Sequence, residues 1–337
     1  YNYIQYENPS LGWTRNAVAH NTVVVDGKEP KTTPPTDIRS DFSPEVKFLA
    51  TSASGVFAGV DQTRALMLTK EYLLDFFYSA SKVPQTYDYL LHSFGRPRPE
   101  RTRSFVGTNN FGPRYEAIQE TRATTVNDDW RFDFVLDEEA LRAHERRVMT
   151  ESLAKKKKKR LKKVHYGDEW YKHTATARVT MAGVPNTDVT YGVGPDGLTV
   201  LVARRTQATQ SLFTVVHEPF AGSDEPEVDK VSQLARSQKA SVARIDAKTF
   251  TDYGAVAWDS QGNDESRALA DEADTNTTFS FKNYGYIRVH ADGSVTARGG
   301  WNSFRIPSAV GPVTLNGERV PAERQGGYLV YGTPPNA

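Results

Sequence analysis

Short runs of β-branched and aromatic residues, each followed by a turn dipeptide, constrain the fold of this chain more than any other feature. Residues 22–25 (Thr-Val-Val-Val) precede Asp26-Gly27, and residues 284–289 lie just before Asp292-Gly293. Such pairs supply the positive φ angles of tight hairpin turns. The same elements recur at 198–202, 213–216, Asp196-Gly197 and Asn316-Gly317. Many strands at this spacing favour an antiparallel sandwich over units that alternate helices with parallel strands.

One segment departs from this pattern and predicts a helix inserted between strands. Residues 137–163 contain neither Gly nor Pro and are rich in Ala, Leu, Glu, Arg and Lys. Acidic residues stand at the start of the segment and basic residues at its end, which suits the dipole of a helix. The predicted fold class is therefore all-β, with a large antiparallel β-sandwich, a smaller β-sheet domain and one inserted helix around 137–163.

The length of 337 residues allows one large domain or two ordinary ones. A polar, acidic, turn-rich stretch at 219–227 is a plausible boundary between them. The sequence therefore predicts a central sandwich over residues 1–220 and a smaller sheet domain over residues 221–337.

The formal net charge of +1 hides an uneven distribution of charge. Eight of the nine residues from Lys155 to Lys163 are basic, and without them the chain has 34 basic against 41 acidic residues. A solvated loop is the plain interpretation of such a run, and a contact for an anionic polymer or a targeting signal are alternatives. The overall balance argues against a dedicated nucleic-acid binder. No apolar stretch approaches the roughly 18 residues of a membrane span.

Several common chemistries find no support in the sequence. The chain has no cysteine, which excludes disulfides, thiolate metal sites and cysteine nucleophiles. No histidine pair has a metal-binding spacing, and the motifs of hydrolase elbows, P-loops and dinucleotide sites are absent. His20, at the start of a strand, is by itself most simply a structural histidine. Zinc needs three or four ligands, and the residues around His20 offer no others.

The amino-acid sequences of three segments resemble motifs of the heparinase II/III-like polysaccharide lyases. The first is Ala19-His20-Asn21-Thr22-Val23 with Val25-Asp26-Gly27, and the second is Thr86-Tyr87-Asp88-Tyr89-Leu90-Leu91-His92. The third runs from Arg204-Arg205 through residues 213–219, ending in Glu218-Pro219. Residues 64–75 look like the family's central strands. The resemblance spans roughly residues 1–220 and depends on the shared order of these short motifs.

This resemblance implies a particular architecture and chemistry. In the family, an N-terminal α/α toroid packs on a central antiparallel sandwich, which a smaller β-sheet domain follows. The chain then corresponds to the C-terminal portion of a lyase that cleaves uronic-acid-containing polysaccharide, such as alginate or a glycosaminoglycan, by β-elimination. A base removes the C5 proton, an acid protonates the leaving O4, and polar or cationic groups stabilise the enolate. The main catalytic residues are expected in the toroid, and the protein is expected to be periplasmic or secreted.

The resemblance also suggests roles for individual residues. His20 matches a zinc ligand whose partners, a His and an Asp, are expected upstream of Tyr1, with a structural or substrate-facing His as the alternative. Tyr6 is the catalytic candidate for proton transfer. Its alternative role is core packing or stacking on a sugar ring. Tyr3 and Trp13 are candidates for stacking on sugar rings, and core packing is the alternative role for both. Arg15 can pair with a uronate carboxylate. His92 is a candidate for a residue of the substrate cleft, and the alternative is a structural histidine within the sandwich. Gln85 stands where many members have a His.

Two other functions remain open from the sequence. A non-catalytic carbohydrate-binding or structural sandwich accounts for the abundant aromatic residues, and a polyanion-binding module accounts for the lysine run. The expected partners are an anionic polysaccharide, the toroid of the same protein and a second copy of the chain in a homodimer, with no nucleic acid and no membrane. No organic cofactor is expected.

Overall fold

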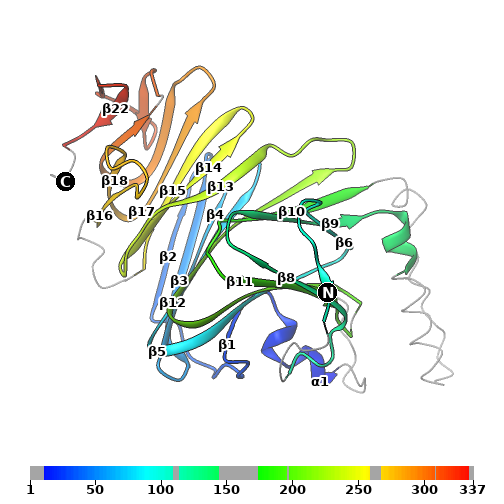
Figure 1. Ribbon diagram of the computed structural model, residues 1–337. Coiled ribbons are helices and arrows are strands. Elements are labelled where there is room, and N and C mark those ends of the chain that lie inside the picture. The colour runs from blue at the N-terminus through cyan, green and yellow to red at the C-terminus, as the bar shows by residue number, and fades with distance from the viewer. Residues whose placement is uncertain are drawn as a thin grey trace.

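The computed structural model describes residues 11–108, 114–143, 174–195, 197–258, 267–307 and 309–333. Most of these residues belong to two β-sheets, in agreement with the predicted all-β class (Figure 1). The twelve strands of the first sheet are β1 Val23–Val25, β2 Asp37–Phe42, β3 Lys47–Phe57, β4 Val60–Leu68, β5 Leu73–Ser93, β6 Arg96–Pro99, β7 Val106–Gly107, β8 Gln119–Val126, β9 Trp130–Leu136, β10 Ala175–Met181, β11 Thr187–Val193 and β12 Thr199–Ala221.

The second sheet follows the first along the chain. Its ten strands are β13 Val228–Arg236, β14 Ala240–Ala247, β15 Phe250–Ala257, β16 Arg267–Ala270, β17 Thr278–His290, β18 Val295–Pro307, β19 Val313–Leu315, β20 Glu318–Val320, β21 Glu323–Gln325 and β22 Tyr328–Tyr331. Pairing is antiparallel throughout the first sheet, whereas the second contains one parallel pair, β18 with β19. The short helices α1 (Leu11–Thr14) and η1 (Ala17–Ala19) precede β1.

The first sheet folds over on itself and forms both layers of a sandwich. The long strands β5 and β12 pair along their whole length and pass from one layer to the other. Their register slips between Arg205 and Gln210, where Gln207 has a φ of 54°. Bulges of this kind bend a strand. One layer thus holds β1, β7, β8, β11, the end of β5 and the start of β12, and we call it the first layer. The remaining strands of this sheet form the second layer.

A core of alternating side chains joins these two layers. Tyr87, Tyr89 and Leu201 of the first layer pack in one cluster with Phe77 and Phe213 of the second layer. Along the start of β5, the intervening residues face the opposite side of the second layer. That strand is therefore buried on both faces, which explains its nearly continuous apolar sequence over residues 72–78.

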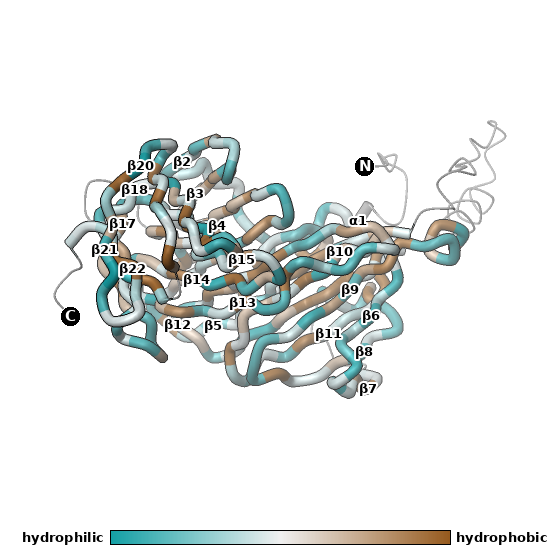
Figure 2. The backbone as a smooth tube through the Cα atoms, turned by 90° about the horizontal axis from the view of Figure 1, so that it is seen from above, coloured by the Kyte–Doolittle hydropathy of each residue, from teal (hydrophilic) through white to brown (hydrophobic). Residues whose placement is uncertain are grey.

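The second sheet packs on the other side of the second layer and forms a third layer (Figures 1 and 2). The ring of Phe48 stacks on Tyr284 with 4.2 Å between centroids, and Tyr78 stacks on Trp258 at 4.9 Å. Each such pair contributes about 0.5–1.5 kcal/mol beyond the burial of its area. The chain leaves the first sheet at residue 221 and enters the second at residue 228. The division into domains 1–220 and 221–337 remains a prediction, and the two sheets share this core.

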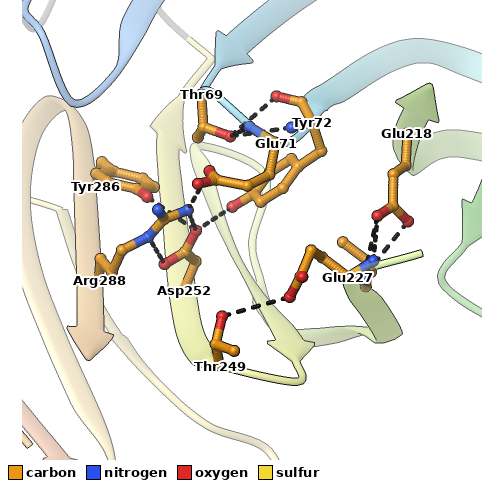
Figure 3. Close-up of polar contacts among 10 residues, drawn as sticks. Thr69, Glu71, Tyr72, Glu218, Glu227, Thr249, Asp252, Tyr286 and Arg288 are labelled. Atoms are coloured by element: carbon orange, nitrogen blue, oxygen red, sulfur yellow. Dashed lines mark hydrogen bonds and ion pairs between the residues drawn. The ribbon is translucent and has the colours of Figure 1, made fainter. Parts of the chain in front are cut away.

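A buried polar cluster also connects the second and third layers (Figure 3). Asp252 is fully buried and accepts hydrogen bonds from the hydroxyls of Tyr72 at 2.5 Å and Tyr286 at 2.8 Å. Arg288 donates to the same carboxylate at 2.8 and 2.9 Å and to Glu71 at 3.0 Å. Since Asp252 and both tyrosines are buried, this cluster serves to hold the sheets together, with only Arg288 and Glu71 partly exposed.

The predicted inserted helix is seen only at its start. Residues 138–143 are helical, and the Oδ1 of Asp137 accepts the backbone N–H of Ala140 at 2.9 Å, as an N-cap does. Residues 144–163, which include the Lys155–Lys163 run, lie outside the described residues. In the described part of the chain, no helix is long and apolar enough to cross a membrane.

Candidate functional site

The outer face of the first layer brings together the first two sequence motifs and Arg204 of the third, whose residues 213–219 lie in the second layer. Helices α1 and η1 lie across the end of β5 and the start of β12 (Figure 1). Trp13 and Val18 of this segment are buried against Leu90 and Val200. The register of the sheet places β1 beside residues 87–89 of β5. We call this surface, with the segment that covers part of it, the candidate face.

Asn21 holds two of the motifs in register. Its side-chain Oδ1 accepts the backbone N–H of His92 at 2.7 Å and lies 3.3 Å from the His92 Nδ1. The carbonyl of the next residue, Thr22, accepts the N–H of Leu90 at 2.9 Å. These bonds extend the pairing of β1 with β5 beyond the strand itself. They explain why an Asn follows the histidine of the first motif.

His92 lies in the candidate face at the end of β5. Its ring meets the Trp13 ring edge-on, with 6.2 Å between centroids. Because the Oδ1 of Asn21 only accepts hydrogen bonds, its contact with the imidazole assigns the proton to Nδ1. The neutral ring then carries its lone pair on Nε2. His92 is half-buried, so whether it touches substrate stays a prediction.

The structure separates the alternatives for the other candidate residues. Trp13 is only 4% exposed and packs in a core cluster, which favours core packing over the predicted sugar stacking. Arg15 is exposed in the same segment, and its pairing with a uronate carboxylate stays a prediction. Tyr3 and Tyr6 lie outside the described residues, so their stacking and catalytic roles also stay predictions.

His20 is exposed beside this cluster and is oriented by a backbone carbonyl. Its Nε2 lies 3.1 Å from the carbonyl oxygen of Thr14. A carbonyl accepts only, so Nε2 carries the proton and the lone pair is on Nδ1. Metal-ligating histidines commonly donate their second N–H to a carbonyl in this way. Among the described residues, however, no group of three or more His, Cys, Asp or Glu side chains is placed to hold a metal. His20 is suited to be one zinc ligand, and the described residues do not complete a site.

A buried ion pair on the candidate face was missed by the sequence analysis. Asp88 is fully buried, and Arg204 donates to both of its carboxylate oxygens, at 2.7 and 2.9 Å. The Tyr115 hydroxyl donates to the same carboxylate at 2.5 Å, and its ring lies under the guanidinium at 5.3 Å. Burial and the neighbouring carboxylate raise the pKa of Tyr115 above its usual range. The ion pair raises the pKa of Arg204 although burial opposes it.

This ion pair adjoins a hollow in the candidate face. The hollow has a volume of about 430 Å³ and is lined mainly by hydroxyl-bearing residues, with one guanidinium and one carboxylate: Ser104, Thr108, Thr124, Thr125, Thr190, Arg204 and Asp188. Val202 lines it as well and belongs to the cluster that holds Trp13. Hydroxyls and an arginine can bind the hydroxyl and acidic groups of a sugar. Asp88 fixes the direction in which Arg204 points.

A second polar cluster lies between the two layers of the sandwich. Arg64 donates to both oxygens of buried Asp75, at 3.1 and 2.7 Å, and to the carbonyl of Asn21 at 2.9 Å. The Tyr89 hydroxyl donates to Asp75 at 2.9 Å and lies 3.1 Å from the His217 Nε2. Burial alone would raise the pKa of Asp75, but the neighbouring His217 and Arg64 lower it. Burial raises the pKa of Tyr89 well above its usual range, so the hydroxyl stays protonated.

These contacts link the second cluster to the candidate face through Asn21. Arg64 and His217 are 28% and 23% exposed at their side chains, whereas Asp75 is fully buried. The buried carboxylate therefore serves to hold two partly exposed basic groups. The sequence offered one signal for both clusters: Asp75 and Asp88 each interrupt a run of apolar residues, and a buried carboxylate needs partners.

Comparisons with known proteins add a weak likeness in structure. No family model and no curated protein sequence matches the chain. Heparan sulfate lyase HepC from Pedobacter heparinus is similar with 12% identity over 73% of this chain and 31% of that one, at a TM-score of 0.37. A crystal structure of heparinase III is similar with 9% identity over 73% of this chain and 30% of that one, also at 0.37. The chain spans less than a third of the length of either protein. Likenesses this weak support no statement about family or activity.

Proposed function

We propose that this chain carries the β-sandwich part of a lyase that cleaves uronic-acid-containing polysaccharide by β-elimination. The observation that supports this most is the meeting of three motifs, far apart in the sequence, on one face. Asn21 of the first motif binds His92 of the second, and Asp88 of the second binds Arg204 of the third. Residues with only a packing role in the core would not need these polar contacts between one motif and the next.

The proposed substrate surface is the candidate face. A uronate carboxylate needs a positive group beside it before its C5 proton becomes acidic, and guanidinium groups match a carboxylate with two parallel hydrogen bonds. Arg204 lines the hollow of this face, and Arg15 is exposed in the segment beside it. His92 and His20 are the imidazole side chains nearby that would serve as acid or base in the proposed reaction. Tyr6 remains the proposed catalytic tyrosine.

The remaining parts of the proposal concern what lies outside the described residues. We propose that an α/α toroid of the same protein covers the candidate face and supplies the main catalytic residues. We propose further that His20 is one zinc ligand, whose Nδ1 would bind the metal. A bound zinc ion there would supply structural support or positive charge near the substrate. A periplasmic or secreted location suits a polysaccharide substrate.

The experiment mixes the full-length natural protein with alginate, heparin, chondroitin and other polyuronates. It follows the ultraviolet absorbance of the unsaturated uronate product. A rise in absorbance on at least one polymer supports the lyase. Arg204→Gln in that protein should reduce the activity, and Arg319→Gln, which changes an exposed residue of β20 in the third layer, should leave it unchanged. Binding of a polyuronate without any product would support the non-catalytic module instead and contradict the lyase.

A further inference from the structure

A ladder of alternating charges crosses the outer strands of the second layer. Arg98 of β6 lies opposite Asp133 of β9, which lies opposite Arg178 of β10, which lies opposite Glu218 of β12. Arg178 donates to both oxygens of Asp133, at 2.8 and 3.0 Å, and Arg98 donates to one of them at 3.0 and 3.2 Å. One carboxylate thus holds two guanidinium groups side by side.

Two further arginines stand beside this ladder, and the carboxylate nearest to Arg131 is shared with a third arginine. Arg131 lies 3.6 Å from Glu100, but Glu100 also binds Arg103 at 3.2 Å. Arg101 is exposed, and its side chain has no hydrogen bond or ion pair within the described part of the chain. Exposed guanidinium groups with spare donors are the usual partners of carboxylates and of sulfate or phosphate groups.

These side chains surround a hollow of about 280 Å³. Four guanidinium groups and two carboxylates line it, which leaves an excess of two positive charges: Arg98, Arg101, Arg131, Arg178, Glu100 and Asp133. A second hollow of about 370 Å³ begins on the other side of Arg98 and Arg178 and is lined in part by Phe220. It also contains three carboxylates, which suit an uncharged sugar ring better than an acidic one: Asp137, Asp224 and Glu225. The Phe220 ring lies 5.6 Å from the Arg178 guanidinium. The two hollows share Arg98 and Arg178 as lining residues. We call the two hollows together the shelf.

Among the described residues, the arrangement of the three layers leaves the shelf open. The third layer covers the second layer over β2 to β5 and β12, whereas β10, β9 and β6 extend past β13, its edge strand (Figures 1 and 2). Side chains on this extension alternate, so Phe132 and Phe134 fill the sandwich core and Arg131 and Asp133 face outward. The candidate face lies on the opposite side of the sandwich. A shelf here is therefore a site separate from the candidate face.

We propose that this shelf binds an acidic glycan, with a sulfate ester or carboxylate of the sugar held by Arg101 and Arg131. Arg101 and Arg131 supply the charge, Arg131 while it keeps its ion pair with Glu100, and the ladder beneath them keeps Arg98 and Arg178 in place. The adjoining hollow and the half-buried Phe220 give room and an apolar surface for the next sugar ring. The choice of a glycan as ligand depends on the proposed lyase function, whereas the site itself depends only on the shelf.

The test measures binding of a sulfated oligosaccharide and its desulfated counterpart by calorimetry at low salt, with the full chain. The double variant Arg101→Gln/Arg131→Gln should weaken binding of the sulfated sugar about tenfold, the sum of two partly exposed charge contacts. Arg319→Gln removes an exposed arginine from β20 in the third layer and should bind as the wild type does. Circular dichroism checks that all variants fold alike.

Three results would overturn the proposal. They are unchanged affinity in the double variant, an equal loss in Arg319→Gln, and inorganic sulfate that binds as tightly as the sulfated sugar, which would mean an anion site without a glycan subsite. Loss of binding in the double variant alone would support it. The lyase assay is separate: a shelf that binds sugar in a full-length protein that makes no unsaturated product would uphold the shelf and refute the lyase.

Discussion

The buried Asp88 is the residue whose replacement tests the construction of the candidate face most sharply. Its carboxylate accepts three hydrogen bonds, two from Arg204 and one from Tyr115, and it is fully buried. Asp88→Asn keeps the shape of the side chain and removes its charge. The guanidinium of Arg204 then loses its counter-ion in a place where its side chain is only 24% exposed.

The cost follows from the two partners. Removing one member of a buried ion pair costs about 3–5 kcal/mol, and partial exposure of Arg204 reduces this to about 2–3 kcal/mol. Tyr115→Phe removes one hydrogen bond to a charged acceptor and should cost about 1.5 kcal/mol. In the double variant the two costs should not add, because the Asp88→Asn change alone would already have weakened the bond to Tyr115.

Urea unfolding, followed by tryptophan fluorescence, measures these free energies. Asp61→Asn changes an exposed carboxylate of β4 and should stay within about 0.5 kcal/mol of the wild type. If Asp88→Asn unfolds with the same free energy as Asp61→Asn, the ion pair does not organise this face. If the losses in free energy of unfolding caused by Asp88→Asn and Tyr115→Phe add fully in the double variant, the hydrogen bond of Tyr115 does not depend on the charge of Asp88.

Three other parts of the molecule give further predictions. The folded-state pKa of Asp75 is lowered, so its ion pair adds stability above the unfolded value of about 3.9 that is lost as pH falls through the folded pKa. Asp75→Asn should therefore lose less stability than the wild type on acidification, as measured by urea unfolding at several pH values. Gly254→Ala places a Cβ 2.5 Å from Leu74 Cδ2, between the second and third layers, and should cost about 1–3 kcal/mol. His20→Gln in the full-length protein should lower its zinc content in elemental analysis.

Each of these predictions has a control or a contrary result. Gly107→Ala is the match for Gly254→Ala, because its added Cβ would meet nothing within 4 Å, and it should be neutral. Equal costs for the two would contradict the close contact of the layers. An acid transition unchanged by Asp75→Asn would contradict the lowered pKa. A full-length protein without zinc, or with zinc retained in His20→Gln, would remove the proposed ligand role.

Local chemistry made much of the fold predictable. The turn at Asp26-Gly27 has φ angles of 51° and 62°, and Asn316-Gly317 has 51° and 90°, as their residue types indicated. The runs at 198–202 and 213–216 are indeed β-structure, but they belong to one strand, β12. The polar residues between them form the bulged bend that carries β12 from one layer to the other.

The candidate site was predictable only in part, since its contacts join residues far apart in the chain. The motifs gave His20 and His92 as separate candidates, and the structure places Asn21, the neighbour of His20, on the backbone N–H of His92. Nothing in the local sequence pairs Asp88 with Arg204, because 116 positions separate them and a strand pattern records only which face a residue occupies. Tyr115 lies outside all three motifs, so its contact with Asp88 had no signal at all.

The central claim is that the candidate face belongs to a polysaccharide lyase. The most direct measurement is product absorbance when the full-length protein meets a panel of polyuronates, with Arg204→Gln and Arg319→Gln beside the wild type. We predict unsaturated uronate from at least one polymer, reduced by Arg204→Gln and unchanged by Arg319→Gln. No product from any polymer, or equal activity in all three proteins, would contradict the account.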